Sequence, residues 1–204
     1  MAGHAHFQAL LLRYSQEPDE ARRQALEAEL WQVYGCERAV LVLDMSGFSQ
    51  LTHRYGIVHY LSMVRRMQLT AEPIVRGFGG VLVKFEADNC FAMFAEVDGA
   101  LRSALALNQA FDAANRMTPD ELDIRIACGI DYGRILVIED RDFFGDPVNR
   151  ACKLGEDLAR PGEILITQAA MARCTDAAGY RAEEVVLSVS GLSLEACSIR
   201  LVET

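Results

Sequence analysis

The chain has 204 residues, of which 51% are hydrophobic and 24% charged, a composition and length that fit one globular domain with a short appendage. Its formal net charge of -9 argues against general nucleic-acid binding, because phosphate backbones demand basic surfaces. No apolar run approaches the roughly 20 residues of a membrane span, and no signal peptide is evident. We therefore expect a cytoplasmic protein with six reduced cysteines, no nucleic-acid partner and no membrane span.

The first 36 residues are expected to form a helical appendage, separate from a main domain over residues 37–204. Apolar residues recur at helical spacing up to a break at Pro18, and a second helix is predicted over 20–34, with Gly35 as its stop. Two roles remain open for this appendage: a dimerising or regulatory helical pair, or a cover for one face of the core. A separate regulatory protein is the other expected source of control.

From residue 37 onward the pattern alternates between short strands and helices. Strands are predicted over 39–43, 81–85, 89–94, 123–129, 134–139 and 163–167, with one or two more over 185–202 around Gly191. Helices are predicted over 48–77, 98–114, 147–158 and 168–173, with an interruption of the first near Pro73. The buried side of that first helix is assigned to Leu51, Tyr55, Val58, Leu61, Val64 and Leu69. This order predicts an α+β fold, an enlarged ferredoxin-like sandwich with helices packed on a mostly antiparallel sheet.

The stretch VLVLDMSGFSQL, residues 40–51, places Asp44 at the end of a buried strand and before a tight turn. One interpretation is a helix N-cap, for which aspartate is a common choice. The other is a carboxylate that holds a metal ion over a phosphate, with N–H groups of the turn pointing at anionic oxygens. On this stretch alone both interpretations stay open.

Four segments in order resemble the catalytic domain of class III nucleotidyl cyclases, which make a cyclic nucleotide from a nucleoside triphosphate. VLVLDMSGFSQL is similar to the family's D-x-x-G-F-[ST]-x-L, and FGGVLVKFEADNCFAMF to G-G-x-x-x-K-x-x-G-D-x-x-x-A-x-F. GIDYG is similar to G-I-x-x-G, and DFFGDPVNRACKL to D-x-x-G-x-x-V-N-x-A-x-R-L. Any one segment is weak, but four in register between about residues 38 and 167 indicate both family and fold.

The resemblance implies a site with two Mg²⁺ or Mn²⁺ ions. Asp44 and Asp88 match the family's two metal positions, and the carbonyl of Met45 would be a further ligand. Hard cations prefer such oxygen ligands, and two carboxylates suffice when phosphates supply others. The turn leading into Phe48 and Ser49 would present N–H groups to the triphosphate. Without the other segments, a hairpin-turn aspartate would be the preferred interpretation of Asp88.

Adenine offers an acceptor at N1 and a donor at its amine, so a lysine and an aspartate complement it. Lys84 and Asp142 fall on the family's two purine-reading positions and predict ATP as the substrate. The plainer alternatives are an edge-strand lysine and a loop aspartate. Asn149 matches the family's ribose-orienting asparagine, and Gly145 the glycine that turns the backbone beside the base.

The resemblance also implies a head-to-tail homodimer with two equivalent sites between its subunits. The metal carboxylates would come from one subunit, and the residues that read the base and ribose from the other. Since every required segment is present in this chain, no different partner is needed.

Four departures from the family pattern bear on activity. Lys153 stands where the family has an arginine that stabilises the transition state, and Ala127 replaces a pyrophosphate-binding arginine, for which Arg125 is a substitute on the same strand face. Residues 185–199 contain no Lys or Arg, and Ala87 replaces a glycine.

The predicted function is an adenylate cyclase that converts ATP to 3′,5′-cyclic AMP and pyrophosphate by a two-metal mechanism, with slow or conditional activity allowed by these departures. The alternatives are a homologue that binds a nucleotide or partner without catalysis, and a cyclase for another base.

Overall fold

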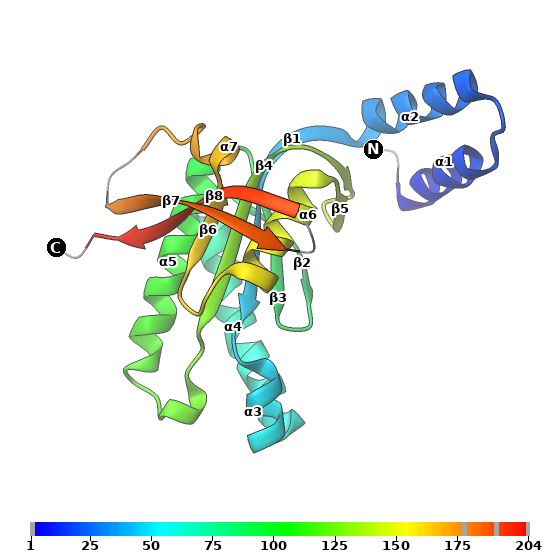
Figure 1. Cartoon of the computed structure of the whole chain (residues 1–204). Helices are drawn as coiled ribbons and strands as arrows, with labels where there is room; N and C mark the ends of the chain where they lie inside the picture. Colours follow the sequence, from blue (N-terminus) through cyan, green and yellow to red (C-terminus); the bar gives the residue numbers. More distant parts are fainter. Residues whose placement is uncertain (1–2, 177–178, 190–191, 203–204) are drawn as a thin grey trace.

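The computed structural model describes residues 3–176, 179–189 and 192–202, without the side chains of residues 48–51, 189 and 192 (Figure 1). The strands are β1 (Gly35–Met45), β2 (Val81–Glu86), β3 (Asn89–Phe94), β4 (Ile126–Ile138), β5 (Asp142–Phe144), β6 (Ile164–Thr167), β7 (Tyr180–Val189) and β8 (Leu192–Leu201). The helices are α1 (His4–Gln16), α2 (Glu20–Tyr34), α3 (Phe48–Tyr55), α4 (Ile57–Gly77), α5 (Val97–Asn115), α6 (Asp146–Cys152) and α7 (Gln168–Met171). A 3₁₀ turn, η1 (Asp120–Leu122), and a π-helical turn, η2 (Lys153–Leu158), complete them.

In the described part of the chain, the strands form one sheet in the order β2-β3-β1-β4-β6-β8-β7, with β5 paired to β4. Every pairing is antiparallel except the one between β4 and β6. Helices α4 and α5 cover one face of the sheet, while α6 and η2 lie on the other (Figure 1). The predicted α+β class, with helices on a mostly antiparallel sheet, is confirmed.

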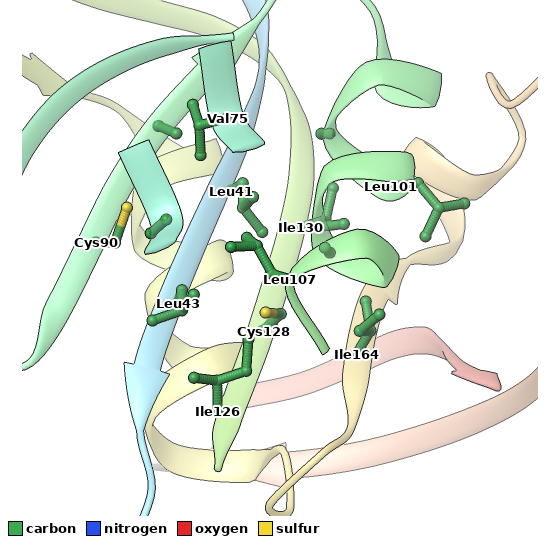
Figure 2. Close-up of a cluster of buried hydrophobic side chains, with 14 of the residues drawn as sticks. Leu41, Leu43, Val75, Cys90, Leu101, Leu107, Ile126, Cys128, Ile130 and Ile164 are labelled. Atoms are coloured by element: carbon green, nitrogen blue, oxygen red, sulfur yellow. The ribbon is translucent and has the colours of Figure 1, made fainter. Parts of the chain in front are cut away.

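Strand β1 shows how the sequence builds both layers. Leu41 and Leu43 point into the core beneath α4 and α5, where Figure 2 shows them near Leu107 of α5. Val40 and Val42 point to the opposite face and pack with Ala151 of α6. Because side chains alternate along a strand, all of these apolar residues of β1 are buried. Asp44, two residues beyond Val42, therefore belongs to the face that carries α6.

The prediction of two strands around residues 131–133 was wrong, because β4 runs unbroken from Ile126 to Ile138 and pairs with β1 up to Leu136. Asp131 does not break the strand, although it is a buried carboxylate. It accepts hydrogen bonds from Arg150 of α6 and from the Thr167 hydroxyl, which satisfy its charge. Part of the predicted loop over 140–146 also forms the short strand β5.

The predicted helix over 48–77 is interrupted at Gly56 and not near Pro73, which lies inside α4. Gly56 has φ +86°, a conformation that a helix cannot contain. The helix restarts with a new rotation after this glycine, so the predicted buried side was largely wrong. Val64 is buried, whereas Tyr55, Val58, Leu61 and Leu69 are exposed, and the side chain of Leu51 lies outside the described residues. The buried side of α4 is formed instead by Tyr60, Met63, Val64, Met67, Ala71 and Val75.

Helices α1 and α2 form a hairpin that projects from the sheet at the side of β5 (Figure 1). The prediction of a helix over 20–34 is confirmed, and the Asp19 carboxylate caps it by accepting from the Arg22 N–H at 2.9 Å. The hairpin has an apolar cluster of its own, which includes Phe7 and Tyr34 and ends on Ile138 of β4. Among the described residues, no helix has the length and apolar character needed to cross a membrane.

Candidate active site

Two carboxylates meet at one corner of the sheet, on the face that carries α6. Asp44 lies near the end of β1, and Asp88 in the turn between β2 and β3. The Met45 N–H donates to the Asp88 carbonyl at 3.3 Å, which ties that turn to the end of β1. Burial, together with the negative charges of Asp88 and Glu156, raises the pKa of Asp44 to about 7. The predicted pair is therefore brought together by the fold.

Three residues that the sequence did not single out belong to this corner. Asn89 faces Asp44 across β3 and β1, and its Nδ2 donates to Glu156 Oε1 at 3.3 Å. Burial, together with its interactions with Asp88, a hydrogen bond among them, raises the pKa of Tyr60 on α4 to about 12. No sequence motif marks Glu156, because its approach to Asp44 and Asn89 depends on how η2 packs over β1.

The donor set of this corner fits a divalent cation. Burial and the negative charges of Asp88 and Glu156 disfavour the ionised form of Asp44, and a bound divalent cation would offset both effects. Within the described parts of the chain, no three His, Cys, Asp or Glu side chains are arranged to hold an ion by themselves. Asp44, Asp88 and the Met45 carbonyl could hold an ion with the help of oxygen atoms from a bound phosphate.

The turn after Asp44 is open. Gly47, the N-cap residue of α3, has φ +87° and offers no side chain to cap the first N–H groups of that helix. Phe48 and Ser49 occupy the first turn of α3, as predicted, but their side chains lie outside the described residues. The Ser46 N–H donates to the Arg125 carbonyl at 2.9 Å, which places Arg125 beside this turn.

The structure also explains one departure from the family pattern. Ala127 lies directly opposite Asp44 in the pairing of β1 with β4 and is only 2% exposed. A longer side chain at 127 would have to displace the groups packed over it. Arg125 precedes the first residue of β4 and is exposed, so its guanidinium is free to reach towards the turn.

Lys84 of β2 and Asp142 of β5 come together in an ion pair, with Nζ and Oδ1 3.1 Å apart. Lys84 also approaches Glu86 at 3.1 Å and lies over the ring of Phe91. Burial lowers the pKa of Lys84, but its hydrogen bonds to Asp142 and Glu86 outweigh that effect and leave it raised. The side chains of Lys84 and Asp142 are each 33% exposed, so both remain accessible to a ligand.

Asn149 and Lys153 lie four residues apart, on one side of the helical segment formed by α6 and η2. Gly145, with φ +146°, precedes α6 and accepts from the Asn149 N–H at 3.2 Å. The segment rests directly on β4, since a Cβ on Gly129 would lie 2.0 Å from the Ala151 carbonyl oxygen. Backbone packing thus fixes the positions of both side chains.

Ala87, which replaces the glycine before Asp88, has φ +51°. A glycine would adopt this left-handed conformation without strain, whereas alanine adopts it at a cost of about 1 kcal/mol. The turn keeps the glycine-like shape despite the substitution.

Comparisons with known proteins support the resemblance found in the sequence, although no family model matches the chain. The chain is 36% identical over 129 residues to the protein named "Putative adenylate cyclase 3" of Rhizobium meliloti, across 63% of this chain and 22% of that protein. The curated relatives it matches are thus much longer, and it covers only 22% to 30% of their lengths.

Comparison with solved structures also supports this resemblance. An adenylate/guanylate cyclase/hydrolase from Silicibacter pomeroyi matches with a TM-score of 0.67 and 28% identity, over 81% of this chain and 96% of that one. The adenylyl cyclase CyaB from P. aeruginosa matches with a TM-score of 0.66 at 18% identity, over 83% and 96% of the two chains. The fold is that of the class III adenylate and guanylate cyclase catalytic domains, and the resemblance is confirmed.

Proposed function

We propose that this chain, which has the fold of the adenylate and guanylate cyclase catalytic domains, converts ATP into 3′,5′-cyclic AMP and pyrophosphate. The observation that carries the proposal is the meeting of Asp44 and Asp88 at one corner of the sheet, beside an open turn. The ion pair between Lys84 and Asp142 on the same sheet supports adenine as the base.

In this proposal the ribose 3′-oxygen attacks the α-phosphorus and pyrophosphate leaves. Two Mg²⁺ or Mn²⁺ ions held by Asp44, Asp88 and the Met45 carbonyl would acidify the hydroxyl and neutralise the leaving group. The backbone N–H groups at the start of α3, by Phe48 and Ser49, donate hydrogen bonds to phosphate oxygens. Arg125 lies beside the same turn and adds positive charge.

The remaining side chains orient the nucleoside. Lys84 donates to adenine N1, and Asp142 accepts from the exocyclic amine, once the nucleotide separates the two. Asn149 directs the ribose, and Lys153 places its charge near the α-phosphate as negative charge develops there. A lysine supplies charge without the planar fork of an arginine, so modest turnover is expected.

The site is proposed to form between two copies of the chain, arranged head to tail. Asp44 and Asp88 of one copy would then face Lys84, Asp142 and Asn149 of the other, and a twofold axis would create two such sites.

Mixing two inactive variants tests this arrangement. Asp44→Ala removes the metal half of a site and Asn149→Ala removes the ribose half, so each purified variant should show little turnover. After equal mixing and subunit exchange, half of the dimers hold one intact site, and about a quarter of wild-type activity should return. Sedimentation velocity would verify that each variant remains a dimer. Absence of any recovery despite subunit exchange would contradict a site shared between subunits.

A second candidate is a cyclase homologue that binds a nucleotide without turning it over. The buried Ala127 favours it because a positive charge is missing there, and Lys153 favours it because a lysine lacks the planar fork with which an arginine grips phosphate. Tight ATP binding with no product would support this candidate over the first.

A further inference from the structure

A cavity of about 840 Å³ opens beside the turn that follows Asp44. It lies between α3 and the loop that precedes β4, and its size is within the range of small-molecule sites. Its lining consists of Ser46, Gly47, Arg54, Tyr55, Asp120, Glu121, Asp123, Arg125 and Pro161. The cavity therefore extends away from the metal corner, starting at the turn expected to hold phosphates.

Two guanidinium groups in this cavity are available to a ligand. In the described part of the chain, neither Arg54 nor Arg125 pairs with a carboxylate, although acidic residues line the same space. The guanidinium of Arg54 lies over the ring of Tyr55, 5.2 Å from its centroid. Both side chains are exposed, so a ligand would not have to break an existing ion pair.

We propose that Arg54 and Arg125 bind the two terminal phosphates of the nucleoside triphosphate and, after reaction, the pyrophosphate. The identity of this ligand rests on the proposed function, while the subsite itself rests on the cavity. A guanidinium offers several donors in a fork that matches phosphate oxygens, and such charge-assisted hydrogen bonds are among the stronger ones. Arg54 lies beyond the motif that ends at Leu51, so no sequence pattern assigned it this role.

The proposal accounts for how the chain manages without the basic groups of its family. The positive charge absent at Ala127 and from residues 185–199 is replaced by two arginines of the protomer that also carries Asp44. One protomer would then hold both the metal ions and the terminal phosphates. Its partner would supply only the groups that read the base, orient the ribose and contact the α-phosphate.

Asp120, Glu121 and Asp123 line the same cavity and oppose a polyanion. The Glu121 backbone is held against α4, where its carbonyl lies 2.8 Å from His59 Nε2. These carboxylates should weaken phosphate binding, and a divalent cation that accompanies the phosphates offsets them. Removing acidic charge from this loop should therefore have the opposite effect to removing an arginine.

Calorimetric titration with inorganic pyrophosphate and Mg²⁺ tests the subsite without needing the base or turnover. Arg54→Gln and Arg125→Gln should each weaken pyrophosphate binding by roughly tenfold or more, while AMP binding stays unchanged. Glu121→Gln should tighten it. The control is Arg65→Gln, since Arg65 is an exposed arginine of α4 that does not line the cavity and should leave both affinities unaltered.

The outcomes separate the subsite from the proposed function. Wild-type pyrophosphate affinity in the double variant Arg54→Gln, Arg125→Gln would overturn the subsite, even if ATP is still cyclised. Weakened pyrophosphate binding in the variants of a protein that makes no cyclic AMP would support the subsite and contradict the function. Circular dichroism of each variant ensures that a loss of binding reflects the missing charge.

Discussion

Replacing Asp44 with asparagine is expected to lower cyclic AMP formation by at least about 10³-fold. The carboxylate is one of two at the metal corner, and an amide is a much weaker ligand for a hard cation. Turnover measured with Mn²⁺ and ATP gives the result directly. Asp157→Asn, which removes an exposed acid from η2, should keep near wild-type turnover and serves as the matched control.

In the absence of divalent cations, the Asp44→Asn variant should be more stable than the wild type. Burial raises the pKa of Asp44 in the folded state from 3.8 to about 7, so the folded protein binds more protons than the unfolded chain between these values. Stability contributed by this group is therefore present below about pH 4 and is lost as pH rises towards 7. At pH 8 Asp44→Asn should melt at a higher temperature than the wild type, with the difference shrinking at pH 5.

Addition of Mn²⁺ at pH 8 should give the wild type a higher melting temperature than Asp44→Asn. The ion neutralises the carboxylate of the wild type and finds no such ligand in the variant. Thermal unfolding with and without Mn²⁺ measures this change. Equal stabilisation of both proteins by Mn²⁺, or wild-type turnover by Asp44→Asn, would contradict the proposal that Asp44 binds the metal.

Exchange of the base-reading pair should have the second large effect. Lys84→Glu combined with Asp142→Ser replaces a donor and acceptor for adenine with groups that suit guanine, whose hydrogen-bonding pattern is reversed. We expect kcat/KM for ATP to fall by about 10²-fold or more, since buried polar groups of the nucleotide would be left unpaired. The preference between ATP and GTP should move towards GTP.

A competition assay with the four nucleoside triphosphates measures this preference. Glu86→Gln is a suitable control, because Glu86 also contacts Lys84 but does not occupy a base-reading position. An unchanged preference for ATP in the double variant would show that Lys84 and Asp142 do not read the base.

The fold class and most elements could be predicted because most strands of this chain are apolar and are separated from their neighbours by clear turns. The hydrophobic periodicity gave wrong predictions in two places, because a single residue there overrides the strand or helix pattern. Asp131 looks like a turn residue, but its bonds to Arg150 and Thr167 allow it to sit inside β4. Gly56 changes the rotation between α3 and α4, and a helical pattern cannot follow a break of that kind.

Some residues of the candidate site could be predicted from the sequence and others could not. Residues in motifs, such as Asp44 and Lys84, could be placed because their spacing is tied to particular turns and strands. Glu156, Tyr60 and Arg54 could not, because each reaches the site through packing between elements distant in sequence. Tertiary contact, which no local pattern records, decides which further charges surround a motif.

Product analysis after incubation of the pure protein with ATP and Mn²⁺ tests the central proposal most directly. We expect 3′,5′-cyclic AMP and pyrophosphate in equal amounts, with none formed when Mn²⁺ is chelated. ATP recovered unchanged, or converted to ADP and phosphate, would contradict it.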